Sequence, residues 1–218
     1  MATWIAHMRI AEHFMNLDER LDCIDFLVGN IGPDCGVPND DWSSFSPDGN
    51  ITHWKLDGNT INAEDFKEKY VNSSGDRFAF YLGYYFHLLT DIAWTDLYEK
   101  KRLEPIYYEG LNADPKYIWT IKRDWYGQDE LFLLSNPDSV FFRVFQHIES
   151  FENVYFDFYP DEAFTRQIHY ITNRYLDAKA DMDRDYPFLS KDEMDTFVDN
   201  TISRLKNIYN EIIDFPNM

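Results

Sequence analysis

Residues 78–94 read FAFYLGYYFHLLTDIAW, an apolar and aromatic run that contains one histidine and one aspartate. The run is long enough for several helical turns, and His87 and Asp91 stand four residues apart in it. In a helix this spacing places the imidazole and the carboxylate on one face, where both can contact the same ion. A buried carboxylate without a partner costs several kcal/mol. We therefore expect a cation, such as a metal ion, beside Asp91.

Helical spacing of apolar residues extends along most of the chain, and no stretch alternates convincingly as a strand. Helix boundaries are marked by Asn62, by the capping box of Ser190 and Glu193, and by the glycines and the proline of residues 29–34. The predicted helices span residues 4–28 (as one helix or two), 62–71, 76–100, 114–123, 136–151, 160–175 and 190–212. The segment 32–60, rich in Asp, Asn, Pro, Ser and Gly, is predicted as a long loop.

These patterns predict an all-α fold, a bundle of about seven to nine helices. The chain has 218 residues, of which 44% are hydrophobic and 18% are aromatic. This composition is sufficient for one sizeable domain with a packed core. We expect residues 1–218 to form a single helical metal-binding domain.

The formal net charge of −19 bears on partners and location. A surface this acidic repels phosphate backbones, so long nucleic acid is not an expected partner. No stretch approaches the roughly 18 apolar residues of a membrane-spanning helix, and the first residues lack the pattern of a signal peptide. Cys23 and Cys35 lack a zinc or redox spacing and are predicted to be free thiols. These features predict a cytoplasmic protein, and they leave its oligomeric state open.

Three further residues can accompany His87 and Asp91 as metal ligands, namely His7, Asp34 and His53. Neutral imidazole and carboxylate are the usual ligands of catalytic Zn²⁺, which lowers the pKa of a bound water to roughly 7. Each residue alone also has an ordinary structural explanation. His7 can be a core histidine, Asp34 a turn residue after a proline, and His53 a loop residue.

Four motifs together carry a resemblance to a known family. They are WIAHMRIAE (residues 4–12), LVGNIGPD (27–34), THW (52–54) and GYYFHLLTD (83–91). In order and rough spacing they resemble the zinc-dependent phospholipase C family, whose superfamily also holds the fungal zinc single-strand nucleases. The resemblance covers about residues 4–100 of this chain. It implies an all-α fold with a cluster of up to three zinc ions that cleaves phosphodiester bonds.

The resemblance also implies roles for particular residues. Asp34, His53, His87 and Asp91 would form the first zinc site and carry the catalysis. His7 would belong to a second site, with Asp91 bridging the two. One zinc ion is expected on this basis, and a second or third ion depends on further ligands.

The chain departs from the family pattern where those further ligands should lie. The family's N-terminal Trp corresponds to Trp4, which three residues precede here. Asp96 stands near the position of a family histidine, and His169 is followed four residues later by Asn173 in place of an acid. An amide oxygen is a poorer Zn²⁺ ligand than a carboxylate. Asp124 and Asp129 flank a Trp-Tyr-Gly-Gln segment and are expected to be structural residues, with metal ligation as the alternative.

Two functions follow from these observations. The first is a metal-dependent phosphoester hydrolase that uses metal-bound hydroxide on a small phosphoester or a phospholipid headgroup. The second is a non-catalytic helical binding or structural domain that keeps one metal ion or none. Metal content and hydrolysis of a generic phosphoester distinguish the two.

Overall fold

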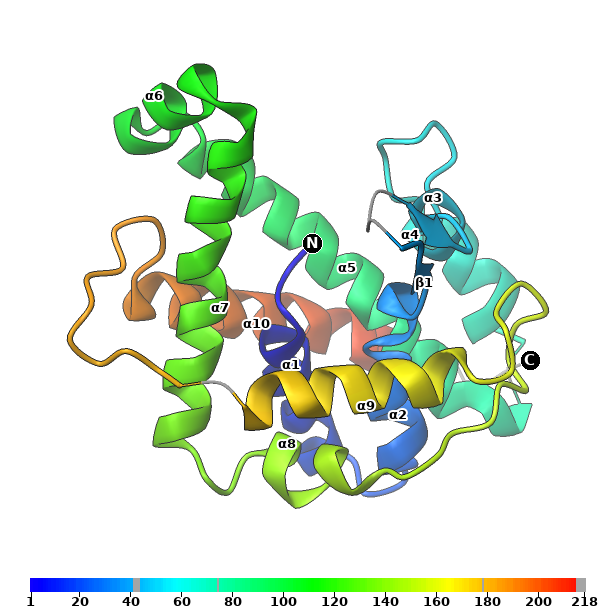
Figure 1. Ribbon diagram of the computed structural model, residues 1–218. Helices are drawn as coiled ribbons and strands as arrows, with labels where there is room; N and C mark the ends of the chain where they lie inside the picture. Colours follow the sequence, from blue (N-terminus) through cyan, green and yellow to red (C-terminus); the bar gives the residue numbers. More distant parts are fainter. Residues whose placement is uncertain (41–43, 74, 178, 215–218) are drawn as a thin grey trace.

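Helices make up most of the structure, a computed structural model that describes residues 1–40, 44–73, 75–177 and 179–214 (Figure 1). The predicted all-α fold is confirmed. The described residues contain ten α-helices, α1 (Trp4–Leu17), α2 (Cys23–Gly29), α3 (Gly49–Thr52), α4 (Ala63–Phe66), α5 (Phe78–Lys101), α6 (Pro105–Ala113), α7 (Ile118–Ser135), α8 (Val140–Arg143), α9 (Ala163–Leu176) and α10 (Lys191–Asp214). Their number exceeds the predicted seven to nine because α3 and α6 have no counterpart among the helices predicted from the sequence.

The apolar run of the sequence forms α5, the central helix of the fold (Figure 1). Every residue from Ala79 to Asp91 is buried, so neighbours surround this part of the helix on all sides. α2 crosses it at very short range. A Cβ atom on Gly83 would lie 2.2 Å from the carbonyl oxygen of Phe26, and one on Gly29 would lie 2.1 Å from that of Phe80. Two glycines therefore allow the backbones of α2 and α5 to touch.

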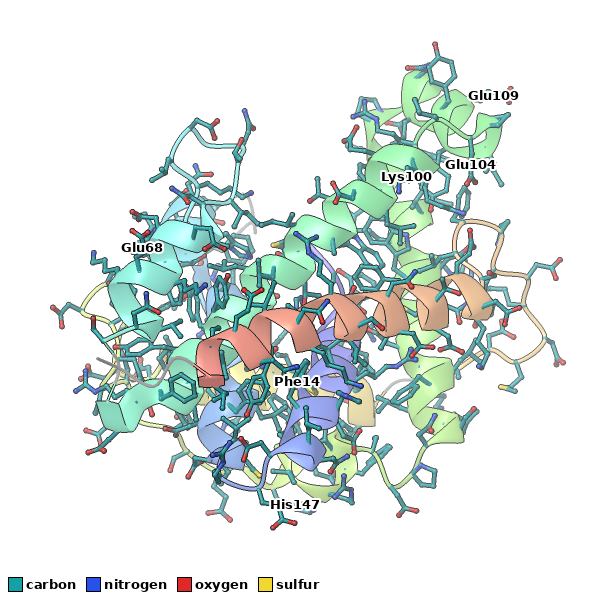
Figure 2. The ribbon with its side chains drawn as sticks, turned by 180° about the vertical axis from the view of Figure 1, so that it is seen from behind. Phe14, Glu68, Lys100, Glu104, Glu109 and His147 are labelled. Carbon is teal, nitrogen blue, oxygen red and sulfur yellow. The ribbon has the colours of Figure 1, made fainter. Side chains whose placement is uncertain are left out.

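α1 and α10 pack against α5 through aromatic rings. The Phe14 ring lies 4.8 Å from that of Phe86 on α5 and 5.5 Å from that of Tyr209 on α10, between centroids. Figure 2, seen from behind, labels Phe14 where α1 approaches α10. An ion pair of 2.6 Å between Arg9 and Asp195 joins the same two helices. α1 is thus held in a fixed position beside α5.

The segment before α1 runs between α5 and α7 (Figure 1). The backbone N–H of Ala2 donates to Oδ1 of Asp91 at 2.7 Å, and the hydroxyl of Thr3 donates to Oδ1 of Asp129 at 2.6 Å. The hydroxyl of Tyr175, on α9, donates to the other oxygen of Asp129. These contacts connect the start of α1 to three other helices.

The capping predictions at Asn62 and at Ser190 with Glu193 are confirmed, whereas α8 begins at Val140 after Ser139 and not at the cap predicted at Asn136. The Asn62 side chain accepts a hydrogen bond from the N–H of Asp65 at the start of α4. At the start of α10, the Ser190 hydroxyl accepts from the N–H of Glu193, and the Glu193 carboxylate accepts from the N–H of Ser190. These are the reciprocal bonds of a capping box.

The helix predicted over residues 136–151 is wrong in its extent. α8 ends at Arg143, and a 3₁₀ turn (Phe145–His147) follows. Beyond that turn, the Thr165 hydroxyl on α9 bonds both the N–H and the carbonyl of Phe151, at 2.9 and 3.1 Å. These bonds hold the backbone of Phe151 in a non-helical segment against α9.

Two other segments differ from the sequence predictions. The helix predicted over 114–123 continues to Ser135, and α6 forms between two predicted helices. The continuation carries buried polar groups with distant partners, since Gln128 donates to the carbonyl of Leu189 and Asp124 accepts from the N–H of Phe188. The predicted loop 32–60 contains α3 and the antiparallel strands β1 (Val37–Pro38) and β2 (Phe45–Ser46).

Within the described ranges, no helix has both the length and the apolar character needed to cross a bilayer. The cytoplasmic location stays a prediction.

Candidate metal centre

Four segments that are distant in the sequence bring five side chains together. His7 comes from α1, Asp34 from a 3₁₀ turn (Gly32–Asp34) after α2, His53 from the position directly after α3, and His87 and Asp91 from α5. The exposed fraction of the side chain is 0% for His7 and His87, 1% for Asp91, 5% for His53 and 9% for Asp34. The group is therefore enclosed, and Asp34 is its most exposed member.

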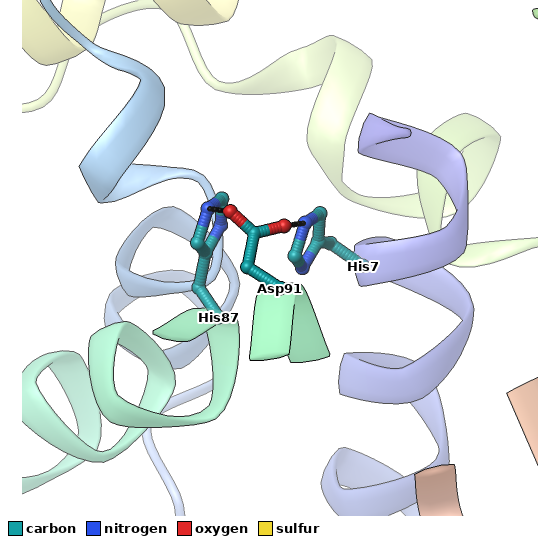
Figure 3. A group of neighbouring side chains, drawn as sticks. All are labelled: His7, His87 and Asp91. Carbon is teal, nitrogen blue, oxygen red and sulfur yellow. Dashed lines mark ion pairs between the residues drawn. The ribbon is translucent and has the colours of Figure 1, made fainter. Parts of the chain in front are cut away.

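Asp91 lies at the middle of this cluster. Its Oδ1 is 3.5 Å from Nε2 of His7, and its Oδ2 is 3.5 Å from Nε2 of both His87 and His53. Figure 3 shows one carboxylate oxygen pointing toward His7 and the other toward His87. Nε2 of His53 also lies 3.3 Å from Oδ1 of Asp34. The side chains form two overlapping groups, His7–His87–Asp91 and Asp34–His53–His87, whose ligand atoms lie within 4.8 Å of one another.

The facing atoms of the cluster lack hydrogen-bond partners. Nε2 of His7, His53 and His87 and Oδ2 of Asp91 are all buried without one. A buried polar atom left in this state costs about 1–3 kcal/mol. Four such atoms lie close together here, and a bound cation would give each of them a partner.

The spacing of these atoms fits zinc. Two ligands held at about 2.0–2.1 Å in tetrahedral geometry lie about 3.3 Å apart. The observed separations are 3.3 Å for His53–Asp34 and 3.5 Å for His87–Asp91. Imidazole nitrogen and carboxylate oxygen are also the donor types of zinc sites in enzymes. The residues present therefore fit a zinc ion in both chemistry and spacing.

Hydrogen bonds behind the cluster fix the orientation of its members. Nδ1 of His87 donates to the carbonyl of Asn30 at 2.7 Å, which leaves Nε2 as the free lone pair facing Asp91. Nδ1 of His53 contacts the Thr52 hydroxyl at 3.0 Å. The indole N–H of Trp4 donates to Oδ2 of Asp34 at 2.9 Å. Such outer contacts orient metal ligands and tune their basicity.

Electrostatics adjusts the protonation of the cluster. Burial, helped by the charge of His87, lowers the pKa of His7 to about 4. Burial also opposes charge on His87, but the charge of Asp91 outweighs it and raises the pKa of His87. The pKa of Asp91 is well below its usual value, because the charge of His87 overcomes the effect of burial. At neutral pH the cluster thus contains an uncharged His7 and an ionised Asp91.

A cavity of about 550 Å³ reaches the cluster at Asp34. Its wall includes Trp4, Trp119, Lys122 and Arg174. A second cavity, of about 270 Å³, is lined by Asp91 and Asp96, and Met1 lines both cavities. Two carboxylates of the cluster, Asp34 and Asp91, therefore lie on cavity walls.

The remaining predicted ligands lie outside the cluster. His169 is exposed, and its Nε2 contacts the carbonyl of Glu149 at 2.9 Å. Asn173 is exposed, and Asp96 is an exposed residue on the wall of the smaller cavity. Across the described part of the chain, neither Asp96 nor His169 belongs to a group of His, Cys, Asp and Glu side chains that could hold an ion.

Two further acidic candidates have structural partners. Asp124 forms a 2.8 Å ion pair with Arg184, and Asp129 accepts hydrogen bonds from Thr3 and Tyr175. His147 is exposed at the edge of the molecule (Figure 2).

Sequence reasoning missed several groups around the site. The supporting contacts of Ala2 and Asn30 are made by backbone atoms, which carry no residue-specific signal. Lys122 gave no signal either, because a single lysine in a helical segment is ordinary. Trp4 lay in a quoted motif, but its bond to Asp34 depends on how two distant segments meet.

Comparison of the chain with protein-family models, with curated proteins and with solved structures finds no significant match.

Proposed function

We propose that this protein is a metal-dependent phosphoester hydrolase that uses zinc, distantly related to the zinc-dependent phospholipase C family. The observation that carries the proposal is the convergence of partnerless nitrogen and oxygen atoms, at zinc-compatible separations, next to a cavity. When bound, zinc supplies Lewis acidity toward a phosphoryl oxygen and makes a bound water more acidic.

The five clustered side chains would hold two metal ions. Asp34, His53, His87 and Asp91 would hold one ion, and His7 would hold a second ion with Asp91 between them. The low pKa of His7 keeps its lone pair free for binding at neutral pH. The hydrolysis breaks the P–O bond of the ester: the oxygen of water ends on phosphorus, and a proton ends on the released alcohol.

A purely structural metal site is the second candidate. It is favoured by the near-complete enclosure of His7, His87 and Asp91, because structural zinc sites are closed while catalytic ones keep an open position. The hydrolase is favoured by Asp34, which lies on the wall of the large cavity. The cluster therefore combines enclosed histidines with two carboxylates that lie on cavity walls.

One experiment separates the candidates. The purified protein is stripped with chelator, reloaded with zinc and dialysed, and zinc is counted by elemental analysis. Hydrolysis of 4-nitrophenyl phosphate and bis(4-nitrophenyl) phosphate is then measured for the wild type, His87→Asn and the matched control His147→Asn. We expect the wild type and the control to bind zinc and hydrolyse an ester, and His87→Asn to lose both. Bound zinc without hydrolysis of either ester supports the structural site, and absence of zinc binding overturns both candidates.

A further inference from the structure

The wall of the larger cavity has more cationic than acidic side chains, whereas the whole chain has more acidic ones. The chain has 39 acidic residues and 20 Lys and Arg residues. The cavity wall instead has two cations, Lys122 and Arg174, and one carboxylate, Asp34. Aromatic rings form much of the rest of the wall, from Trp4, Phe45, Trp119, Trp125, Tyr126 and Tyr170. An anionic and partly aromatic ligand would match this lining.

The two cations of the cavity differ in their partners. Arg174 pairs with Glu130 at 3.3 Å, so its charge is partly neutralised. Lys122 is half-buried and, within the described part of the chain, has no carboxylate at ion-pair distance. Its Nζ lies 5.0 Å from the centroid of the Trp119 ring. Burial lowers the pKa of Lys122, and the charge of Asp34 opposes this shift without a direct ion pair. The donors of the half-buried ammonium are therefore available to an anion.

We propose that this cavity binds a small phosphomonoester whose alcohol carries a planar aromatic ring, with the phosphoryl group at Lys122 near Asp34 and the ring against Trp119 and Tyr126. The proposal rests on the proposed function, because it assigns a substrate class to the same site. Lys122 holds the phosphoryl oxygens, and the aromatic side chains hold the alcohol by stacking and exclusion of water.

The charge of the cavity disfavours a phosphoester with a cationic headgroup. Its volume of about 550 Å³ lies in the range of sites for small molecules. A quaternary ammonium headgroup binds aromatic faces through its positive charge. Lys122 already lies over Trp119, and the guanidinium of Arg174 lies 5.6 Å from the centroid of Tyr126. A cationic headgroup would therefore meet two like charges, while a neutral ring would not.

Binding of stable phosphonates tests the proposal without any hydrolysis. Phenylphosphonate and methylphosphonate share the anion and differ in the ring, and phosphocholine carries a cationic group instead. Isothermal titration calorimetry measures their dissociation constants with the zinc-loaded and the chelator-treated protein. The variants are Lys122→Met, Lys122→Arg and Trp119→Ala, with Lys116→Met as the control on an exposed lysine near the start of the same helix.

We expect phenylphosphonate to bind about tenfold or more tightly than methylphosphonate, and phosphocholine to bind most weakly. Lys122→Met should weaken both phosphonates by about tenfold or more, because it removes a charge-assisted hydrogen bond. Lys122→Arg should restore most of that affinity, and Lys116→Met should change nothing. Trp119→Ala should weaken phenylphosphonate alone. Trp119 is 64% exposed, so its removal leaves the core intact.

Equal affinity for the two phosphonates, tightest binding of phosphocholine, or no effect of Lys122→Met would overturn the inference. These outcomes are separate from those of the proposed function. If the protein hydrolyses an ester with zinc but does not bind the phosphonates, the hydrolase stands and the proposed substrate class is overturned. If phosphonate binding depends on Lys122 but the protein holds no zinc, the ligand class of the cavity stands and the zinc hydrolase is overturned.

Discussion

The imidazole rings of His7 and His87 lie face to face, with their centroids 3.8 Å apart and their planes within 1° of parallel. The two rings come from α1 and α5, and each directs its Nε2 toward a different oxygen of Asp91. Protonating both stacked rings would place two positive charges at close range in a buried site. This arrangement agrees with the opposite shifts of their pKa values, lowered for His7 and raised for His87.

The stacked pair allows the two overlapping ligand groups to be separated by mutation. His7→Phe keeps a ring in the stack but removes one ligand, and the group Asp34–His53–His87 remains. His87→Phe removes the ligand that both groups share. We expect about one zinc ion per chain for His7→Phe and none for His87→Phe, as counted by elemental analysis after dialysis. Equal zinc content in the two variants would contradict the assignment.

Metal removal should lower the stability of the protein. The unfolded chain lacks a preformed cluster, so zinc at about 100 times its dissociation constant should add about 2.7 kcal/mol to the free energy of unfolding. For a chain of this length that corresponds to a rise in Tm of roughly 5–10 °C. Thermal melts in chelator, zinc and magnesium measure the effect. Magnesium is the control, since it prefers oxygen ligands in octahedral geometry. The prediction fails if magnesium stabilises as much as zinc.

Asp129 should make stability depend on pH. Burial raises its pKa from 3.8 to about 7, in spite of the hydrogen bonds from Thr3 and Tyr175. Between these two values the folded state holds a proton that the unfolded state has released. The contribution of Asp129 to the free energy of unfolding is therefore full below pH 3.8 and is lost as the pH rises to about 7.

Asp129→Asn removes this titration. Urea unfolding of the metal-free proteins at pH 5, 6, 7 and 8 should show the wild type losing stability relative to the variant as the pH rises from 5 to 7. Above that range the difference should become constant. Parallel curves over the whole range would mean that Asp129 ionises normally in the folded protein.

The crossing of α2 and α5 should tolerate no side chain at Gly83. A Cβ there would lie 2.2 Å from a backbone oxygen, so Gly83→Ala must push the two helices apart. We expect a loss of about 2–3 kcal/mol in the free energy of unfolding. Gly49→Ala is the matched control, because nothing lies within 4 Å of its Cβ. Urea denaturation of both variants measures the difference, and an equal stability for the two would refute the crossing geometry.

Local sequence patterns predicted much of the fold. The apolar run at 78–94 indicated the buried helix, and Asn62 and the Ser190–Glu193 box marked helix starts that the structure confirms. These signals are readable because their interactions occur within one or two helical turns of the same segment. The four motifs likewise pointed to the five residues that the structure brings together.

Other features depended on partners far along the chain. The continuation of α7 past Arg123 places Gln128 opposite the carbonyl of Leu189, 61 residues away, and α8 stops early where Thr165 binds the backbone of Phe151. Asp96 and His169 have suitable chemistry for metal ligands, but the packing of their helices keeps them outside the cluster.

The helical class, the main helices and the chemical types of the candidate ligands can be predicted from the chain, because periodicity, caps and side-chain chemistry are local properties. The folded arrangement establishes which ligands face one another, that Trp4 and Asn30 support them, and that Lys122 lines an aromatic cavity together with Asp34. These relationships depend on the contact between α2 and α5 and on the docking of α1, α7 and α9 around them. No local pattern encodes such contacts, since each requires side chains from segments that meet only in the folded protein.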